Sequence, residues 1–345
     1  MVFLFSGAKR GEEPREQAQK LLVLWRLRGK IQAVQFMPSA SLTPARVKFW
    51  GVRGSIPVPG CDTLRYGGNT TCVEFRADGE IIVLDAGTGI RGLGAALDEE
   101  FGTKPIHLTL LITHMHWDHI QGFPFFVPSY SDKNHIRVMG YDGTGAGLRD
   151  ILVGQMATPF FPVELDALPS RIEIERLQKY EFNIGKIKVR AKLMNHPGIC
   201  VGYRLDTSQG SIAFLPDNEP YDGLKIHSTN SDSLGEKETA ARAGAARTEL
   251  VDFLRGCDLL ILDTQYTDEE YKSHVGWGHG WLSATVRLAL DAEVKKLVLF
   301  HHDPTHDDDE MDAMAEKARQ LVSESGKRLE MEVAREGTET TLSAD

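Results

Sequence analysis

The run His114-Met115-His116-Trp117-Asp118-His119 decides the fold of this chain of 345 residues. It follows the stretch from His107 to Thr113, which is short and apolar enough to be a buried strand. Side chains two residues apart on an extended strand end point the same way, so His114 and His116 can bind one metal ion together. A helix predicted over 119–126 then turns Asp118 and His119 toward a neighbouring position.

Imidazole and carboxylate groups are ligands that suit Zn, Mn or Fe. A cluster this dense predicts more than one ion, so we expect two divalent metal ions, Zn first, with Mn or Fe as alternatives. The other interpretation is a histidine-rich surface turn. The strongly apolar strand before the run disfavours that interpretation.

Three more candidate ligands, His196, Asp217 and His301, each follow a predicted strand later in the chain. Any one alone would more often be a turn or capping residue, but their recurrence at strand ends favours a shared site. We predict three ligands for one ion (His114, His116 and His196), three for the other (Asp118, His119 and His301), and Asp217 as the bridge. This arrangement leaves room for a metal-bridging hydroxide, the nucleophile that such sites generate at neutral pH.

Apolar patterns and turn residues predict the remaining elements. Strands are expected over 47–51, 71–75, 81–85, 107–113, 136–139, 172–176, 186–193, 200–205, 211–215, 258–263 and 296–300. Helices are expected over 93–97, 119–126, 147–155, 237–255, 282–291 and 309–324. In both halves, strands are followed by loops that carry His or Asp and then by helices. This order predicts an α/β protein with two sheets packed face to face and helices outside, a four-layered αββα sandwich.

The domain organisation is expected to be simple. Residues 1–45 are predicted to be an N-terminal extension, partly helical or disordered, because leucines alternate there with Arg, Lys and Gln before a linker. One hydrolase domain is expected over 46–345. The polar stretch after Tyr221 and the helix that follows predict an inserted loop and helix at 221–250.

The composition, with 41% hydrophobic and 26% charged residues, allows a large core without disulfides, so any metal is expected to be catalytic. The net charge of -10 argues against general nucleic-acid binding, which needs clustered Lys and Arg. The four cysteines are scattered, no apolar run is long enough to cross a membrane, and no signal-peptide pattern is recognisable. These features predict a cytoplasmic protein without a membrane partner.

The run from His114 to His119 resembles the H-x-H-x-D-H signature of the metallo-β-lactamase fold superfamily. Leu84-Asp85-Ala86-Gly87-Thr88-Gly89 resembles an earlier motif of that superfamily, whose carboxylate organises the site without binding metal. The resemblance covers residues 47 to about 340, with the motifs in the same order. It implies a metal-dependent hydrolase.

The later motifs resemble one branch of the superfamily, which contains tRNase Z and cyclic-nucleotide phosphodiesterases. Asp217 stands at the bridge where the best-known β-lactamases have Cys, Asp263 ends a predicted strand, and His279 follows in Gly276-Trp277-Gly278-His279. In that branch, the acidic residue positions the histidine, which protonates the leaving group. The predicted catalytic residues are therefore Asp118, Asp263 and His279.

The resemblance implies a phosphodiesterase acting on small cyclic or nucleotide-like phosphodiesters. tRNA is disfavoured as a partner, because the chain is acidic, lacks a recognisable Gly/Pro-rich arm, and has Asp263 where tRNase Z usually has Glu. A homodimer is expected by analogy with this branch.

Three alternatives remain open. A lactone or thioester hydrolase would use the same metals without needing His279. A di-iron protein that reduces oxygen or nitric oxide can share this fold, but such proteins carry a flavin partner, and no flavin domain is recognisable here. A non-catalytic binding protein is disfavoured because no predicted ligand is missing. Arg53, Ser55 and Asn69 lie in Gly-rich turns, and either line the substrate cleft or hold the turns.

Overall fold

Two sheets, each with seven strands, form the centre of the computed structural model, which describes residues 44–142, 147–221 and 236–342. The strand order is β14-β1-β2-β3-β4-β5-β6 in the first sheet and β13-β12-β11-β10-β9-β8-β7 in the second. The strands are β1 (Arg46–Gly51), β2 (Cys72–Ala77), β3 (Glu80–Leu84), β4 (His107–Leu111), β5 (His135–Gly140), β6 (Arg171–Arg176), β7 (Glu181–Ile184), β8 (Ile187–Leu193), β9 (Val201–Thr207), β10 (Gly210–Leu215), β11 (Leu259–Asp263), β12 (Lys296–Phe300), β13 (Glu330–Val333) and β14 (Glu339–Thr341).

The α-helices mostly connect parallel strands. They are α2 (Ile90–Phe101), α3 (Trp117–Ile120), α4 (Leu148–Gln155), α5 (Glu236–Leu254), α6 (Asp268–Tyr271), α7 (Leu282–Asp291) and α8 (Asp308–Ser325). Strands β3 to β6 pair in parallel, as do β10 to β13, and the remaining neighbours pair antiparallel. Parallel neighbours need a crossover connection, which explains why helices separate these strands in the sequence.

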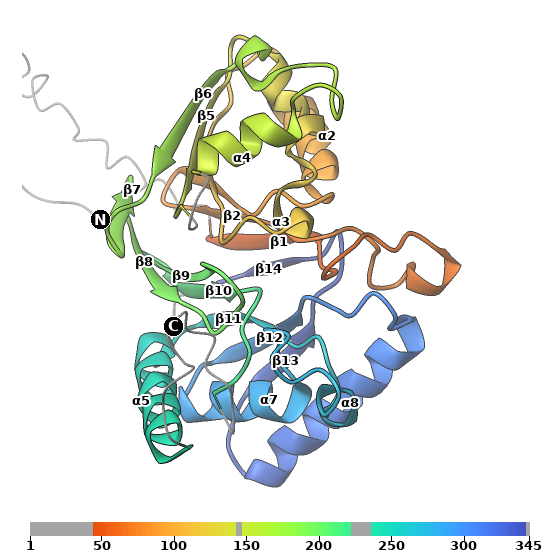
Figure 1. Ribbon diagram of the computed structural model, residues 1–345, viewed down its shortest axis with the longest axis vertical. Coiled ribbons are helices and arrows are strands. Elements are labelled where there is room, and N and C mark those ends of the chain that lie inside the picture. Colours follow the sequence, from red (N-terminus) through yellow and green to blue (C-terminus); the bar gives the residue numbers. More distant parts are fainter. Residues whose placement is uncertain (1–43, 143–146, 222–235, 343–345) are drawn as a thin grey trace, which may run out of the picture. The chain divides into compact units, whose positions relative to one another are not determined.

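The buried apolar side chains lie in three layers. Between the sheets, Phe49 of β1 packs against Phe300 of β12, with ring centroids 6.2 Å apart. Helices α2 and α4 cover the outer face of the first sheet, and α5, α7 and α8 cover that of the second (Figure 1). Leu93 of α2 and Val286 of α7 are among the buried side chains of these two outer layers. The predicted four-layered αββα sandwich is therefore confirmed.

The predicted helix over 119–126 is wrong. Helix α3 ends at Ile120, and 3-10 turns follow at Phe123–Phe125 and Val127–Tyr130. Pro124 is the physical reason, because it has no N–H to donate and its ring would clash with the carbonyl of residue 120 in a continuous helix. Phe126 then takes an extended conformation, with ψ 98°.

Each predicted strand is present, but sequence analysis missed the three short strands β7, β13 and β14 and the single turn of α6. All three strands lie at sheet edges. An edge strand pairs on one side only and is partly exposed, as the burial of β13 and β14 illustrates. The three strands are also short, with four, four and three residues, so any apolar alternation in them covers too few positions to predict a strand.

The extension and any helix predicted within residues 1–45 fall almost wholly outside the described residues, and so does the 222–235 part of the predicted insertion. The domain limits therefore stay a prediction. From residue 236 the chain forms α5, close to the helix expected at 237–255. No helix in the described part of the chain combines the length and the apolar character that crossing a membrane requires.

Candidate metal centre

The carboxyl ends of the parallel strands carry the side chains of the candidate site. Asp85 follows β3, His114 lies beyond β4, Asp217 follows β10, Asp263 ends β11, and His301 follows β12. Because parallel strands end at the same edge of a sheet, each sheet collects its polar side chains at one rim, where open α/β sheets bind ligands. The rims of both sheets contribute to one cluster.

This cluster divides into groups whose ligand atoms all lie within 4.8 Å of one another. The first group is His114, His116, His196 and Asp217, the second is Asp118, His119 and His301, and a third is Asp217, His279 and His301. The structure thus brings together all seven side chains predicted as ligands, in the predicted division. His116 and Trp117 are exposed, so the cluster opens to solvent on that side.

Asp217 lies between the two groups. Its Oδ1 is 3.0 Å from His119 Nε2 and 3.4 Å from His301 Nε2. Its Oδ2 is 3.6 Å from His196 Nε2 and 3.7 Å from His114 Nε2. One carboxylate oxygen therefore faces each group, as a bridging ligand requires.

The donor atoms at the centre of the cluster lack ordinary partners. His114 Nε2, His119 Nε2 and Asp217 Oδ1 are fully buried, and the nearest polar atoms to them belong to other candidate ligands, as in the 3.0 Å contact between the last two. Buried polar atoms are almost always satisfied, so atoms of this kind that converge from several elements suit a bound cation. A His/Asp set fits Zn and related divalent ions, and the cluster is consistent with a binuclear metal site.

The histidines of the first group are held neutral. Burial lowers the pKa of His114 well below its usual value and that of His196 to about 4, although Asp217 acts against it. A neutral imidazole presents a free lone pair, which is the form that binds metal.

His119 differs because three carboxylates surround it. Burial alone would lower its pKa, but Asp118, Asp217 and Asp85 outweigh burial and raise the pKa well above its ordinary value. A metal ligand must be deprotonated, so an ion at Nε2 would take the place of that proton.

Partners behind the cluster fix the orientation of its rings. His119 Nδ1 lies 2.8 Å from Asp85 Oδ2. The same Asp85 carboxylate accepts from the backbone N–H and the hydroxyl of Thr113, at 2.7 and 2.8 Å. His196 Nδ1 donates to the carbonyl oxygen of Gly278 at 2.9 Å. Each contact leaves Nε2 facing the cluster, which is how outer partners orient metal-binding histidines.

His301 is oriented by Gln265, which sequence analysis missed, and through it by Asp303. Its Nδ1 lies 3.1 Å from Gln265 Oε1, and Gln265 Nε2 donates to Asp303 Oδ2 at 3.1 Å. The sequence signal was positional, because Gln265 stands two residues after the predicted strand-end residue Asp263.

His279 and Asp263 form a hydrogen-bonded pair beside the cluster. His279 Nδ1 is 3.1 Å from Asp263 Oδ2, and the His279 ring stacks on His301 at 5.0 Å between centroids. Asp263 is fixed in turn, because its oxygens accept from the backbone N–H groups of Asn218 (3.0 Å) and Gln265 (3.1 Å). The predicted neighbourhood of Asp263 and His279 is therefore present.

The charge of this pair favours a protonated imidazole. Burial alone would lower the pKa of His279, but the carboxylate of Asp263 and then those of Asp217 and Asp118 raise it to about 9. His279 can therefore hold a proton at neutral pH and donate it.

Arg53 and Asn69 hold turns rather than line a cleft. Arg53 is fully buried, and its guanidinium donates to the carbonyl oxygens of Gly67 at 2.8 Å and His306 at 2.6 Å. The side chain of Asn69 donates to Glu336 Oε2 at 2.9 Å. These bonds tie the loop after β1 to the loops around β12 and β13.

The adjacent residues Gly54 and Ser55 contact the cluster through their backbone. The Ser55 N–H donates to Asp118 Oδ2 at 2.8 Å. Gly54 packs against His301 so closely that a Cβ would lie 2.5 Å from the imidazole ring. The turn that Arg53 anchors therefore positions one carboxylate and one imidazole of the second group.

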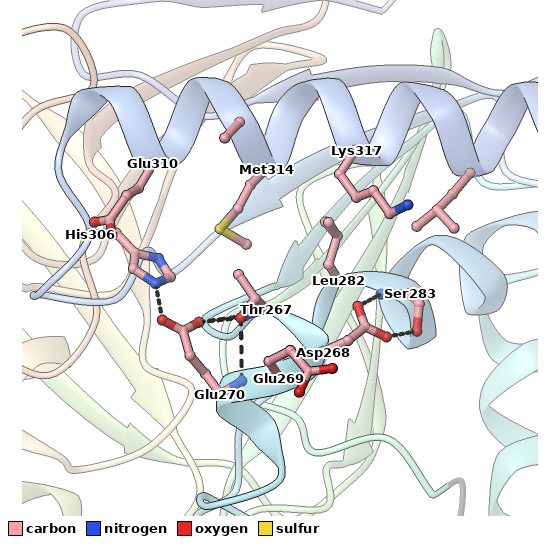
Figure 2. A pocket seen from close by; sticks show the side chains of 12 residues that line it. Thr267, Asp268, Glu269, Glu270, Leu282, Ser283, His306, Glu310, Met314 and Lys317 are labelled. Atoms are coloured by element: carbon pink, nitrogen blue, oxygen red, sulfur yellow. Dashed lines mark hydrogen bonds and ion pairs between the residues drawn. The ribbon is translucent and has the colours of Figure 1, made fainter.

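A separate cavity of about 450 Å³ lies between α6, α7 and α8. Figure 2 shows His306 hydrogen-bonded to Glu270 of α6, with Met314 and Lys317 farther along the α8 side of the cavity. Its lining residues differ from those of the His/Asp cluster. His306 therefore forms part of the wall of this cavity, although it lies close to His301 in the sequence.

Comparison with known families and proteins agrees with this geometry. A family model described as "Beta-lactamase superfamily domain" matches residues 81–231. The match includes the run from His114 to His119, His196 and Asp217, whereas Asp263, His279 and His301 lie beyond it. Ribonuclease Z of Clostridium tetani is 23% identical over 292 residues, covering 75% of this chain and 89% of that protein.

Two solved structures have the same fold. The short form of human tRNase Z superposes with a TM-score of 0.55 at 18% identity, covering 86% of this chain and 99% of that one. Unliganded yeast PDE1 superposes with a TM-score of 0.56 at 13% identity, covering 87% of this chain and 100% of that one. The relatives named ribonuclease Z give no support to the prediction that tRNA is disfavoured as a partner.

Proposed function

We propose that this chain, a metallo-β-lactamase superfamily protein distantly related to ribonuclease Z, is a binuclear metal-dependent hydrolase of phosphodiesters. Small cyclic or nucleotide-like diesters are the proposed substrates. The observation that carries this proposal is the His279–Asp263 pair, whose atoms lie 3.1 Å apart beside the cluster. Thioester hydrolysis expels a thiolate, which leaves without such a proton donor, whereas an alkoxide that departs from phosphorus needs one.

In the proposed site, His114, His116 and His196 hold one ion, Asp118, His119 and His301 hold the other, and Asp217 bridges them. The convergence of these donors and the orphaned atoms at their centre support this assignment. When bound, the two ions would act as Lewis acids on phosphoryl oxygens and lower the pKa of a water molecule toward neutrality.

The protein's own groups handle the leaving oxygen. As an oxygen derived from water bonds to phosphorus, the P–O bond to the leaving group breaks, and the leaving oxygen takes a proton from His279. The Asp263 carboxylate accepts a hydrogen bond from His279 Nδ1 throughout the reaction. This bond leaves His279 Nε2 available to donate, and it stabilises the imidazolium before the proton transfer. The raised pKa of His279, about 9, supports this role because the donor is charged before the reaction.

A substrate panel with metal analysis on a single preparation tests the proposal. We expect two equivalents of divalent metal and turnover of bis-p-nitrophenyl phosphate and of cyclic nucleotides. tRNA belongs in the panel because of the relatives named ribonuclease Z. Metal-replete protein that leaves every diester intact but cleaves a lactone or thioester readily would overturn the proposal.

A further inference from the structure

Glu219 is a buried acidic residue that none of the roles above uses. It stands two residues after Asp217, and its exposed fraction is 0%. Oε1 accepts from the Tyr271 hydroxyl and from the Gly276 N–H, both at 2.7 Å, and Oε2 accepts from the Gly278 N–H at 3.1 Å. One carboxylate thus binds α6 and two points of the turn that follows it.

That turn is connected to two histidines of the proposed site, His279 and His196. Gly278 immediately precedes His279 in the chain, and its carbonyl oxygen accepts from His196 Nδ1 at 2.9 Å. Gly278 has φ +93°, and a Cβ there would lie 2.4 Å from His196 Nδ1. The backbone of the turn is therefore packed directly against the ring of His196.

The segment that carries Glu219 is itself anchored to the cluster. Asp217 faces both groups of ligands, and the Asn218 N–H donates to Asp263 Oδ2 at 3.0 Å. The Glu219 N–H donates to the carbonyl oxygen of Asn195 at 2.8 Å, next to His196. Three consecutive residues therefore make three different contacts. Asp217 belongs to the cluster, Asn218 contacts Asp263, and Glu219 contacts the turn before His279.

We propose that Glu219 is a positioning residue whose carboxylate holds the 276–278 turn. The 276–278 turn then places His279 against the cluster and orients His196 through the carbonyl oxygen of Gly278. The part that concerns His279 rests on the proposed function. The part that concerns His196 needs only that the cluster binds metal.

A carboxylate suits this task better than an amide. The three donors converge on two oxygens, and an ionised carboxylate is acceptor-only, so it can receive all of them. In Glu219→Gln, the NH2 group would face at least one of these N–H or O–H donors. That donor would lose its acceptor inside the protein, and the turn would shift to regain one.

The test compares three variants of the full chain in its metal-loaded form. Glu219→Gln removes the charge, and Tyr271→Phe removes one of the three donors while keeping the ring that stacks on Trp281. Glu269→Gln is the matched control, because Glu269 is an exposed residue of the same helix, paired with Lys272. Zinc retention is measured by competition with a chelator. Turnover is measured on two diesters, one with an alkyl and one with a p-nitrophenyl leaving group.

We expect Glu219→Gln to bind zinc about 10- to 100-fold more weakly at one of the two positions, the usual effect of losing an outer partner of a metal-binding histidine. Alkyl diester turnover should fall about tenfold or more beyond any loss on the p-nitrophenyl diester, because p-nitrophenolate leaves without a proton. Tyr271→Phe should change both readouts in the same direction by less. Glu269→Gln should match the unaltered protein.

Wild-type zinc retention together with a wild-type ratio of the two turnover rates in Glu219→Gln would overturn the proposal. If that variant does not fold, Tyr271→Phe decides: a smaller loss in both readouts supports the proposal, and unchanged values overturn it. If the unaltered protein cleaves no diester, the proposed function fails, and weakened zinc retention in Glu219→Gln still supports the positioning of His196.

Discussion

Asp263→Asn should convert the proposed proton donor from a charged to a largely neutral group with almost no change in the size of residue 263. The amide oxygen can still accept from His279 Nδ1, across the 3.1 Å that now separates that nitrogen from Asp263 Oδ2. The negative charge that contributes most to the raised pKa of His279 is lost, and burial, which lowers the pKa, then dominates. We expect the pKa to fall from about 9 to 6.5 or below.

The size of the effect follows from the protonated fraction. At pH 8, a group with a pKa near 9 is about nine-tenths protonated, and one with a pKa near 6.5 is about one-thirtieth protonated. Turnover of an alkyl diester should therefore fall about 30-fold at pH 8. At pH 6 both forms of His279 are mostly protonated, so the loss should shrink to roughly threefold or less. Bound metal ions would lower the pKa of His279 in the unaltered protein and in Asp263→Asn alike. The pH profiles of the two proteins would therefore stay separated.

The assay is the pH dependence of kcat between pH 6 and 9, with the metal content of each sample measured. Asp252→Asn serves as the control, since Asp252 is an exposed residue of α5 paired with Arg255. A p-nitrophenyl diester should lose little at any pH. A loss on the alkyl diester that is equal at pH 6 and pH 8 would refute the reasoning, because it would not come from protonation of His279.

His279→Ala should lower alkyl diester turnover about 10²- to 10⁴-fold with both ions retained, since general acid catalysis contributes that much. Metal analysis and a comparison of the alkyl and p-nitrophenyl diesters check this prediction, and loss of metal would contradict it. Asp217→Ala should weaken the binding of both ions, because each oxygen of Asp217 faces one group of ligands. Zinc stoichiometry after dialysis measures this effect, and two retained equivalents would exclude a bridging role. Gly54→Ala should displace the ring of His301, which lies 2.5 Å from the added Cβ, and weaken one zinc position selectively; chelator competition should then resolve one weakened and one unchanged ion.

Sequence analysis predicted which side chains would converge because each of them follows a strand whose apolar residues are recognisable. The spacing of His114 and His116 and the strand-end positions of Asp217 and His301 needed no knowledge of distant contacts. The αββα layers followed from the same alternation of strands and helices. The helix over 119–126 failed for a local reason, since Pro124 prevents regular helical hydrogen bonding after Ile120.

Local patterns of apolar and chelating residues were therefore enough to predict the fold class and the convergence of the candidate ligands. How these side chains are held depends on contacts that form only in the folded chain. Glu219 and Gln265 belong to no motif, and their roles arise from contacts with residues 36 to 59 positions away in the chain. A buried polar residue acquires its function from the donors that surround it, and packing alone brings those donors together.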